Sequence, residues 1–361
     1  MNDFKLHAAR LEPALSEALT RVLHSGWYIL GKEVEAFERE FAAYLGVAHA
    51  IGVGNGMDAL QLGLMAWDIG PGDEVITTPN SAFASTLAIL RAGATPVFVD
   101  LDERDYALDV RRIEAAITER TRALLPVHIY GRAADLTALE AIAARHRLML
   151  LNDACQAHGA RHKGRDIASY GAASAYSFYP TKNLGCLGDG GMIVCADPDK
   201  AARLRALRDY GQKQRYHHAE PGLNSRLDEL QAAVLREKLK QLPAHTAHRR
   251  AIARRYIENL SGLPLLLPNY DDEAVWHLFV LRADKRDALS QFLREREIQS
   301  LVHYPVIIPE QPAMNRPYTR GSLPIAERCA REFLSLPIHP ELSLAEVDNV
   351  CAAVRAFFES A

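Results

Sequence analysis

The sequence predicts an α/β fold, with a mostly parallel sheet flanked by helices and a smaller C-terminal α+β domain. Up to about residue 200, short apolar runs alternate with amphipathic helical patterns, which is typical of a parallel sheet with helices on both faces. The chain has 361 residues, and a single hydrophobic core usually does not extend over so many. Pro243 separates two helical patterns. We therefore expect a large domain over residues 1–242, with an N-terminal helical segment, and a small domain over residues 243–361.

The individual elements follow from hydrophobic patterns and turn residues. The apolar run 48–53 predicts a strand, and a glycine turn then leads into a helix that includes residues 59–65. The apolar run 148–151 predicts a short buried strand. In the C-terminal part we expect helices over 226–242, up to 260, over 285–297 and over 343–358, with a strand over 275–281.

Composition and charge exclude several classes of protein. Lys plus Arg number 42 and Asp plus Glu 45, so the net charge of −3 gives no basic surface for nucleic acid or an anionic membrane. No apolar run approaches the ~20 residues of a membrane span, and the first residues lack the apolar core of a signal peptide. The five cysteines are odd in number and have no metal-binding spacing, which predicts free thiols in a reducing compartment. We expect a soluble cytoplasmic protein with no nucleic-acid or membrane partner.

Lys182 is the candidate catalytic residue. The segment 177–185 reads Ser-Phe-Tyr-Pro-Thr-Lys-Asn-Leu-Gly, and Gly-Asp-Gly-Gly follows at 188–191. Aromatic, small and glycine neighbours lower the pKa of an amine toward nucleophilic use, so Lys182 is a candidate for a Schiff base. A solvated surface lysine is the ordinary alternative, and other residues have to decide between the two.

Pyridoxal phosphate chemistry needs a lysine, a carboxylate for the pyridine nitrogen, an anion site for the phosphate and a flat group against the ring. Asp153 follows the strand predicted at 148–151, at the edge of the sheet where α/β proteins bind ligands. Its carboxylate can keep the ring nitrogen protonated, and Gln156 can donate to the phenolic oxygen of the ring. The sequence therefore offers a candidate for each polar requirement of the ring.

A candidate phosphate site follows the strand at 48–53. Strand, glycine turn and helix start together present backbone N–H groups at the positive end of a helix dipole. Ser177 can add a hydroxyl group from the segment that carries Lys182. A glycine turn without a ligand is the ordinary alternative, because such turns are common.

These segments resemble the DegT/DnrJ/EryC1/StrS family of pyridoxal phosphate-dependent nucleotide-sugar aminotransferases, which have fold type I (aspartate aminotransferase-like). The resemblance covers nearly the whole chain in a fixed order. A regulatory or binding protein on the same scaffold is the non-enzyme alternative, but it would not need Lys182, Asp153 and Gln156 together. The other matching segments are 25–31, 70–76, 93–100, 126–131, 210–212, 223–233, 303–305 and 334–337.

The resemblance implies a role for each cofactor residue. Lys182 would form the covalent imine with pyridoxal 5′-phosphate and move protons in a cycle that passes through pyridoxamine phosphate. Asp153 would pair with the ring nitrogen, and Gln156 would contact the ring oxygen. Met57 stands where relatives usually have a hydroxyl residue and would donate only its backbone N–H. The other implied contacts are Gly56 and Ser177 at the phosphate, Phe83 stacked on the ring, and Asn224 reaching the phosphate of the neighbouring subunit in a homodimer with shared active sites.

The resemblance and the aromatic pattern also give six candidate substrate contacts. Arg215 and Tyr216 are implied to lie near the neighbour's substrate pocket. A buried tyrosine in the core or a hydrogen-bonded structural histidine is the ordinary alternative for the others. Adjacent His217 and His218 cannot both face one ion on a regular element, so no metal is expected. The six candidates are Tyr28, Tyr179, Arg215, Tyr216, His303 and Tyr304.

The implied reaction moves an amino group from L-glutamate to a nucleotide-linked keto-sugar, a step of deoxyaminosugar biosynthesis. Segments 210–217 and 303–306 look most similar to family members that act on 3-keto-6-deoxyhexoses. We therefore expect amination at C3 of a dTDP-linked 3-keto-6-deoxyhexose, giving a dTDP-3-amino-3,6-dideoxyhexose. Two alternatives stay open, namely C4 amination of an NDP-4-keto-6-deoxyhexose and C3 amination of a UDP-keto-uronic acid. The dehydrases of the family have histidine in place of the lysine, so Lys182 disfavours that chemistry.

Overall fold

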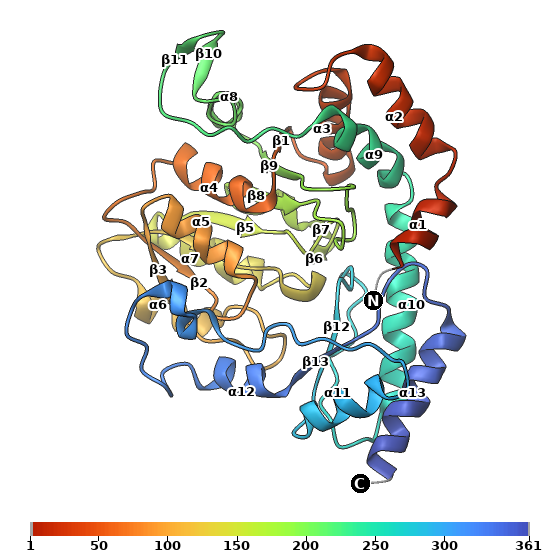
Figure 1. The fold of residues 1–361 in the computed structure, drawn as a ribbon. Coiled ribbons are helices and arrows are strands. Elements are labelled where there is room, and N and C mark those ends of the chain that lie inside the picture. Colours follow the sequence, from red (N-terminus) through yellow and green to blue (C-terminus); the bar gives the residue numbers. More distant parts are fainter. Residues whose placement is uncertain (1–2, 360–361) are drawn as a thin grey trace.

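A computed structural model describes residues 3–359, and its centre is one seven-stranded sheet of order β1-β9-β8-β5-β4-β2-β3 (Figure 1). All neighbouring strands are parallel except β9, which runs antiparallel to both β1 and β8. The mostly parallel sheet that the sequence predicts is therefore confirmed. The strands are β1 (His49–Val53), β2 (Glu74–Thr77), β3 (Thr95–Phe98), β4 (Thr121–Leu125), β5 (Met149–Asp153), β8 (Ala173–Ser177) and β9 (Gly191–Cys195).

Side chains of alternate residues along the strands enter two separate hydrophobic clusters, because successive residues of a strand face opposite sides of a sheet. Ile193 joins one cluster with the helix after β1, whereas Met192 and Val194 join the other with the helix before β1. Helices cover both faces (Figure 1). They include α3 (Lys32–Leu45), α4 (Gly56–Ala66), α5 (Phe83–Arg91), α6 (Val110–Ala116), α7 (Leu136–His146) and α8 (Pro198–Leu207).

The ends of β1 and β8 meet at one residue of β9. Gly191, the first residue of β9, is in register with both Val53 and Ser177. A Cβ atom on Gly191 would lie 2.3 Å from the carbonyl carbon of Asn55, so only glycine allows the backbones to approach this closely. The glycine turn after β1 and the segment after β8 therefore lie side by side at the same edge of the sheet.

The predicted helix over 226–242 is shorter in the structure. It is α9 (Glu229–Leu239), and the next helix, α10 (Leu242–Leu260), begins one residue before Pro243. The backbone explains the later start, because Asp228 pairs with Ile29 in an isolated bridge and the N–H of Glu229 donates to the carbonyl of Tyr28 at 3.1 Å. The Glu229 carboxylate in turn accepts hydrogen bonds from three N–H groups at the start of α3. Two further helices, α1 (Phe4–Arg10) and α2 (Ala14–Ser25), form the N-terminal helical segment.

The C-terminal part contains a two-stranded antiparallel sheet and its own hydrophobic cluster, built from residues between Ile252 and Phe357. The strand expected over 275–281 begins only at Phe279, because the N–H groups of Val275 and Leu278 bond to carbonyls of the 130–131 loop. Phe333 joins a cluster of the large sheet instead, and the domain boundary at 242/243 stays a prediction. The elements are β12 (Phe279–Arg282), α11 (Arg286–Arg294), α12 (Pro324–Glu332), β13 (Phe333–Leu336) and α13 (Leu344–Glu359).

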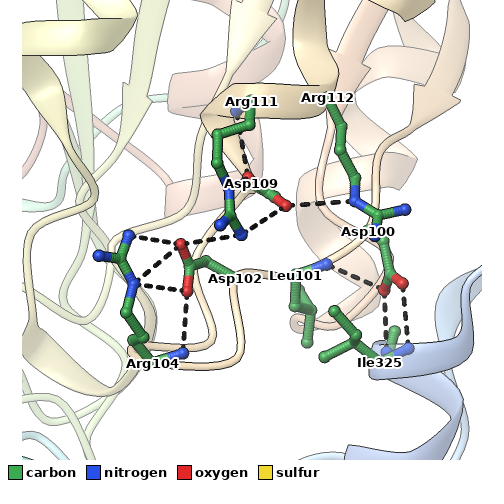
Figure 2. Close-up of polar contacts among 9 residues, drawn as sticks. Asp100, Leu101, Asp102, Arg104, Asp109, Arg111, Arg112 and Ile325 are labelled. Atoms are coloured by element: carbon green, nitrogen blue, oxygen red, sulfur yellow. Dashed lines mark hydrogen bonds and ion pairs between the residues drawn. The ribbon is translucent and has the colours of Figure 1, made fainter.

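Asp100, just after β3, joins helix α12 to the large sheet (Figure 2). It is 2% exposed, and its carboxylate accepts hydrogen bonds from the N–H groups of Ile325 (3.0 Å) and Ala326 (2.9 Å) in the first turn of α12. Neighbouring Asp102 and Asp109 instead pair with exposed arginines (Figure 2). Asp100 therefore anchors the helix that leads directly into β13.

The remaining elements are short. They are β6 (Arg161–His162), β7 (Arg165–Asp166), β10 (Gln212–Gln214), β11 (His217–His218), and the 3₁₀ turns Ile129–Gly131, Ile167–Ser169, Ile308–Glu310 and Pro312–Met314. The five cysteines are all free, as predicted. Among residues 3–359, no helix is both long and apolar enough to cross a membrane. Within the same range, no group of three or more His, Cys, Asp and Glu side chains is placed to hold a metal ion.

Candidate active site

Helix α4 starts at the edge of the sheet with free backbone donors. The side chain of Asn55, its N-cap residue, accepts a hydrogen bond from the N–H of Asp58 at 2.9 Å. The N–H groups of Gly56 and Met57 belong to the same first turn, where helix geometry provides no intrahelical partner. Together with the positive end of the helix dipole, these two donors form an anion site.

Ser177 lies directly against this helix start. A Cβ atom on Gly56 would come within 2.7 Å of the Ser177 Cβ and 2.8 Å of the Cys155 Sγ, so glycine at position 56 permits this contact. The Ser177 hydroxyl accepts one hydrogen bond, from the N–H of Tyr179 at 3.3 Å, and can still donate its own proton. The sequence-based grouping of Gly56, Met57 and Ser177 at one anion site is consistent with this geometry.

Asp153 is the last residue of β5 and is 4% exposed. Its carboxylate accepts hydrogen bonds from the Ser85 hydroxyl at 2.7 Å and from the N–H of Cys155 at 3.1 Å. Both donors are neutral, and no arginine or lysine in the described part of the chain forms a salt bridge with it. A fixed, buried carboxylate of this kind suits a protonated ring nitrogen. Ser85, which accepts a hydrogen bond from the Ser81 hydroxyl at 3.1 Å, was not singled out from the sequence, because Asp153 lies 68 residues away along the chain.

Lys182 lies close to Asp153 and is half-buried. Burial lowers the pKa of the Lys182 ammonium group, and the nearby Cys155 and Asp153 oppose this shift. A lower pKa makes the neutral, nucleophilic amine more available at neutral pH. This agrees with the sequence-based argument that an uncharged setting favours a reactive lysine.

The residues after Lys182 are tied down on both sides. The Asn183 amide donates to the carbonyl of Val275 at 2.9 Å and is hydrogen-bonded to His277 Nδ1 at 3.1 Å. Lys238 Nζ donates to the carbonyl of Gly185 at 2.6 Å. These contacts join the lysine segment to α9 and to the loop before β12, so Lys182 is held by a rigid frame. Asn183 and His277 were not singled out from the sequence, because their partners are distant along the chain.

Two histidines near Lys182, the buried His158 and the half-buried His303, are held neutral. Burial lowers the pKa of His158 to about 3 and that of His303 to about 4, and the charge of Lys182 adds to both shifts. His158 Nε2 is hydrogen-bonded to the carbonyl of Ser177 at 2.9 Å, and His303 Nδ1 to the Ser335 hydroxyl at 2.8 Å. Neutral, hydrogen-bonded rings support the frame of the site and do not exchange protons at neutral pH.

Gln156 has both ends of its carboxamide engaged. The N–H of Tyr130 donates to its Oε1 at 2.7 Å, and its Nε2 donates to the Tyr304 hydroxyl at 3.2 Å. Nε2 carries two hydrogens, so one of them remains for the ring oxygen that the sequence assigns to Gln156. Two candidate substrate residues, His303 and Tyr304, thus lie at the site within a single chain.

The other candidates lie elsewhere or remain untested. Phe83 is the first residue of α5 and half-buried, and its stacking on a ring stays a prediction. Tyr28 and Tyr179 are 49% and 52% exposed. The Arg215 guanidinium lies 5.1 Å from the centre of the Tyr216 ring, on the β10–β11 hairpin that projects from the body of the chain (Figure 1). Asn224 is also exposed.

Comparison with known proteins gives a consistent result. The model of the DegT/DnrJ/EryC1/StrS aminotransferase family matches residues 10–355. A dTDP-3-amino-3,4,6-trideoxy-α-D-glucose transaminase of Streptomyces venezuelae is 50% identical over 361 residues, which cover 99% of this chain and 95% of that protein. A dTDP-3-amino-3,6-dideoxy-α-D-galactopyranose transaminase of Aneurinibacillus thermoaerophilus is 47% identical over 98% of both chains.

The solved structures agree with the sequence comparison. The crystal structure of S. venezuelae DesV in complex with a ketimine intermediate superposes with a TM-score of 0.97 at 50% identity, covering 99% of this chain and 97% of that one. The fold that the sequence predicts, including the part after residue 242, is therefore that of a solved aminotransferase.

Proposed function

The chain belongs to the DegT/DnrJ/EryC1/StrS aminotransferase family, and on this basis we propose that it aminates C3 of a dTDP-linked 3-keto-6-deoxyhexose. The product would be a dTDP-3-amino-3,6-dideoxyhexose. The observation that carries the proposal is that one edge of the sheet joins an amine of lowered pKa, a buried carboxylate and an open helix N-terminus. The two relatives compared above are both named for dTDP-linked 3-amino sugars, which supports the choice of nucleotide and of carbon.

Pyridoxal 5′-phosphate, the cofactor of this family, supplies an electron sink for negative charge on the reacting carbon when it is bound. In our proposal the N–H groups of Gly56 and Met57 and the Ser177 hydroxyl hold its phosphate. Asp153 would keep the ring nitrogen protonated, and Phe83 would cover the ring. Lys182 Nζ would bind the cofactor covalently, and its free amine would take a proton from one carbon and return it to another. Its lowered pKa favours the neutral form that can accept that proton.

A second subunit and an amino donor complete the proposed site. We assign Asn224 to the phosphate of the neighbouring subunit and Arg215 and Tyr216 to its substrate pocket, so that a homodimer completes each site. Exposed Leu23, Trp27 and Leu187, which are more than half exposed in the single chain, support an interface, because large apolar side chains in contact with water favour association. L-glutamate is the proposed amino donor. The free cysteines support a cytoplasmic location.

Three further candidates would line the substrate pocket that the two chains would form. Tyr28 and Tyr179 would contact the sugar or nucleotide, since their rings are partly exposed and offer both an apolar face and a hydroxyl group. His303, neutral and fixed by Ser335, would line the same space without transferring protons.

The experiment is a pair of incubations with pyridoxal phosphate and L-glutamate, each analysed by NMR of the sugar product. One contains the dTDP-linked 3-keto-6-deoxyhexose and the other dTDP-4-keto-6-deoxyglucose. We expect a new amine at C3 in the first reaction and no amine at C4 in the second. Amination at C4 alone would replace the proposal with its nearest rival. If glutamate converts the cofactor but neither sugar reacts, the UDP-keto-uronic acids become the substrates to test.

A further inference from the structure

Tyr130 makes two hydrogen bonds that connect Gln156 to the segment that carries Tyr304. Its backbone N–H donates to Gln156 Oε1 at 2.7 Å, and its hydroxyl donates to the carbonyl of His303. Gln156 Nε2 in turn donates to the hydroxyl of Tyr304, the residue next to His303. Three residues and one peptide bond therefore form a closed ring of contacts, in which no member can turn without breaking a hydrogen bond.

This ring leaves one orientation for the Gln156 carboxamide. Oε1 must face the N–H of Tyr130, so Nε2 must face Tyr304. Gln156 is 4% exposed, and a turned amide would set its nitrogen against the N–H of Tyr130, donor against donor, which is costly inside a protein. The second hydrogen of Nε2 then has a fixed direction.

The segment that carries Tyr304 is itself anchored from the small-domain sheet. His303 Nδ1 is hydrogen-bonded to the Ser335 hydroxyl on β13, and the backbones of Leu301 and Ser335 pair across an isolated bridge. Tyr304 is half-buried and lies near Asp153 and Cys155. Burial raises the pKa of Tyr304 to about 12, so the hydroxyl group stays protonated at neutral pH.

From this geometry we infer that Tyr304 is a positioning residue: its hydroxyl group holds the Gln156 carboxamide so that the free Nε2 hydrogen is directed at the phenolic oxygen of the cofactor. The inference rests on the proposed function, because it requires pyridoxal phosphate at this edge of the sheet. The sequence-based assignment of Tyr304 as a sugar contact stays a prediction beside this role, since a hydroxyl that accepts from Gln156 can still donate its own proton.

The consequence is a measurable change in the bound cofactor. A hydrogen bond donated to the phenolic oxygen stabilises the negative charge on that oxygen. This charge lacks a neighbouring proton once the nitrogen that joins Lys182 to the cofactor is deprotonated. The donor therefore lowers the pH at which the cofactor changes colour. If Tyr304 no longer holds Gln156, this hydrogen bond weakens and the colour change moves to higher pH. A weakened neutral hydrogen bond corresponds to an upward shift of about 0.5 to 1 pH unit.

The test is a pH titration of the absorbance of the loaded protein, without any sugar, for wild type and Tyr304→Phe. Tyr256→Phe is the matched control, because it also removes a buried hydroxyl that makes one hydrogen bond, to the carbonyl of Pro337 at 2.9 Å, in the small-domain core. We expect an upward shift of the midpoint in Tyr304→Phe and none in Tyr256→Phe. An unmoved midpoint in Tyr304→Phe would overturn the inference.

A double variant shows whether Tyr304 acts through Gln156. In a Gln156→Met background, adding Tyr304→Phe should leave the midpoint where the single Gln156→Met variant has it. Additive shifts would overturn the inference, because they would mean that the Tyr304 hydroxyl contacts the cofactor independently. If wild type never takes up the cofactor, the proposed function fails together with this inference. If wild type turns yellow and only the sugar KM changes in Tyr304→Phe, the inference alone fails.

Discussion

Helices α4 and α12 both begin at the edge of the large sheet, but their N-termini are filled differently. At α12, the buried carboxylate of Asp100 accepts from two N–H groups of the first turn. At α4, the Asn55 side chain accepts a hydrogen bond from the N–H of Asp58, and the N–H groups of Gly56 and Met57 have no partner within the helix. The fold therefore supplies its own anion to one helix and leaves a site for an external anion at the other.

This difference separates a structural helix start from a functional one. A third case supports it, because Glu229 fills the N-terminus of α3 with three hydrogen bonds. At α12 and α3, a carboxylate from another segment joins two parts of the chain, so its hydrogen bonds stabilise the protein as soon as it folds. An open N-terminus beside Ser177 and Lys182 gains stability only when a phosphate binds. Variants at the start of α12 should therefore change the stability of the fold, and variants at the start of α4 should change cofactor binding and activity.

The largest expected effect is the loss of activity in Lys182→Ala at the open site. The variant lacks the amine that binds the cofactor covalently and moves the proton, so turnover should fall by at least ~10³-fold. Its unfolding temperature should stay near that of wild type without cofactor, because Lys182 is only half-buried. Steady-state assays and thermal unfolding measure the two quantities. An active variant would show that the open site is not catalytic.

Acid should destabilise the protein through His158 and His303, the two neutral histidines near Lys182. The folded pKa values of His158 and His303, about 3 and 4, lie below the unfolded value of about 6.5. Between these values the unfolded chain binds more protons, so stability is fully present above pH 6.5 and is lost as the pH falls toward 4. We expect the free energy of unfolding to drop by ~2 kcal/mol or more between pH 6.5 and 4.5.

Chemical unfolding at the two pH values measures this drop. The variant His158→Gln should show a smaller drop, because one of the buried groups that take up a proton on unfolding is gone. An equal pH dependence in the variant would assign the acid sensitivity to other groups.

At the filled helix, Asp100→Ala should destabilise the fold. The substitution leaves two N–H groups of α12 without their partner at a buried position, so the free energy of unfolding should fall by about 2 to 4 kcal/mol. Urea unfolding measures it, and Arg104→Ala is the control. The Arg104 side chain is 74% exposed in its pair with Asp102, so its loss should cost much less stability than the loss of Asp100. Equal losses would remove the contrast between a buried cap and a surface pair.

Ser177→Ala, beside the start of α4, should lower the affinity for the cofactor and leave the stability of the fold nearly unchanged. The loss of one hydroxyl donor to a charged phosphate should weaken cofactor binding by roughly 10- to 100-fold. The stability of the cofactor-free protein should change little, because the hydroxyl accepts only a long hydrogen bond of 3.3 Å from Tyr179. Fluorescence titration with pyridoxal phosphate gives the Kd. Unchanged affinity would place the phosphate away from Ser177.

The smallest effect is expected for Met57→Ser, which adds a hydroxyl group to the first turn of α4. This hydroxyl can donate to the phosphate that the Met57 backbone already contacts in our proposal, so affinity should improve by up to about 10-fold. The same titration measures it. Weaker binding would mean that the methionine side chain, half-buried against the sheet cluster, contributes more through packing.

The sequence predicted the parts of the fold and site that depend on local patterns. Asp153 at the end of β5, the glycine turn before α4 and the position of Lys182 after β8 follow from short segments, because strand, turn and helix signals are local. The antiparallel direction of β9 was not anticipated. Nothing in residues 191–195 indicates which strands they pair with, and that choice depends on the whole sheet.

Contacts between distant segments could not be predicted. The hydrogen bond from Ser85 to Asp153 joins residues 68 positions apart, and that from Gln156 to Tyr304 joins residues 148 apart. Only the folded chain shows that Tyr304 faces a cofactor residue and that Asp100 fills the start of α12. The C-terminal strand also began later than expected, because the loop at 130–131 competes for its N–H groups.

The most direct test is to find which lysine the cofactor binds. The protein is loaded with pyridoxal phosphate, reduced with borohydride and digested, and mass spectrometry locates the modified residue. Our account predicts one modified lysine, Lys182, in wild type and in Asp100→Ala, and weaker labelling of the same residue in Ser177→Ala. Labelling mainly at another lysine, such as Lys238 next to the same segment, would contradict the assignment of the open edge beside α4 as the cofactor site.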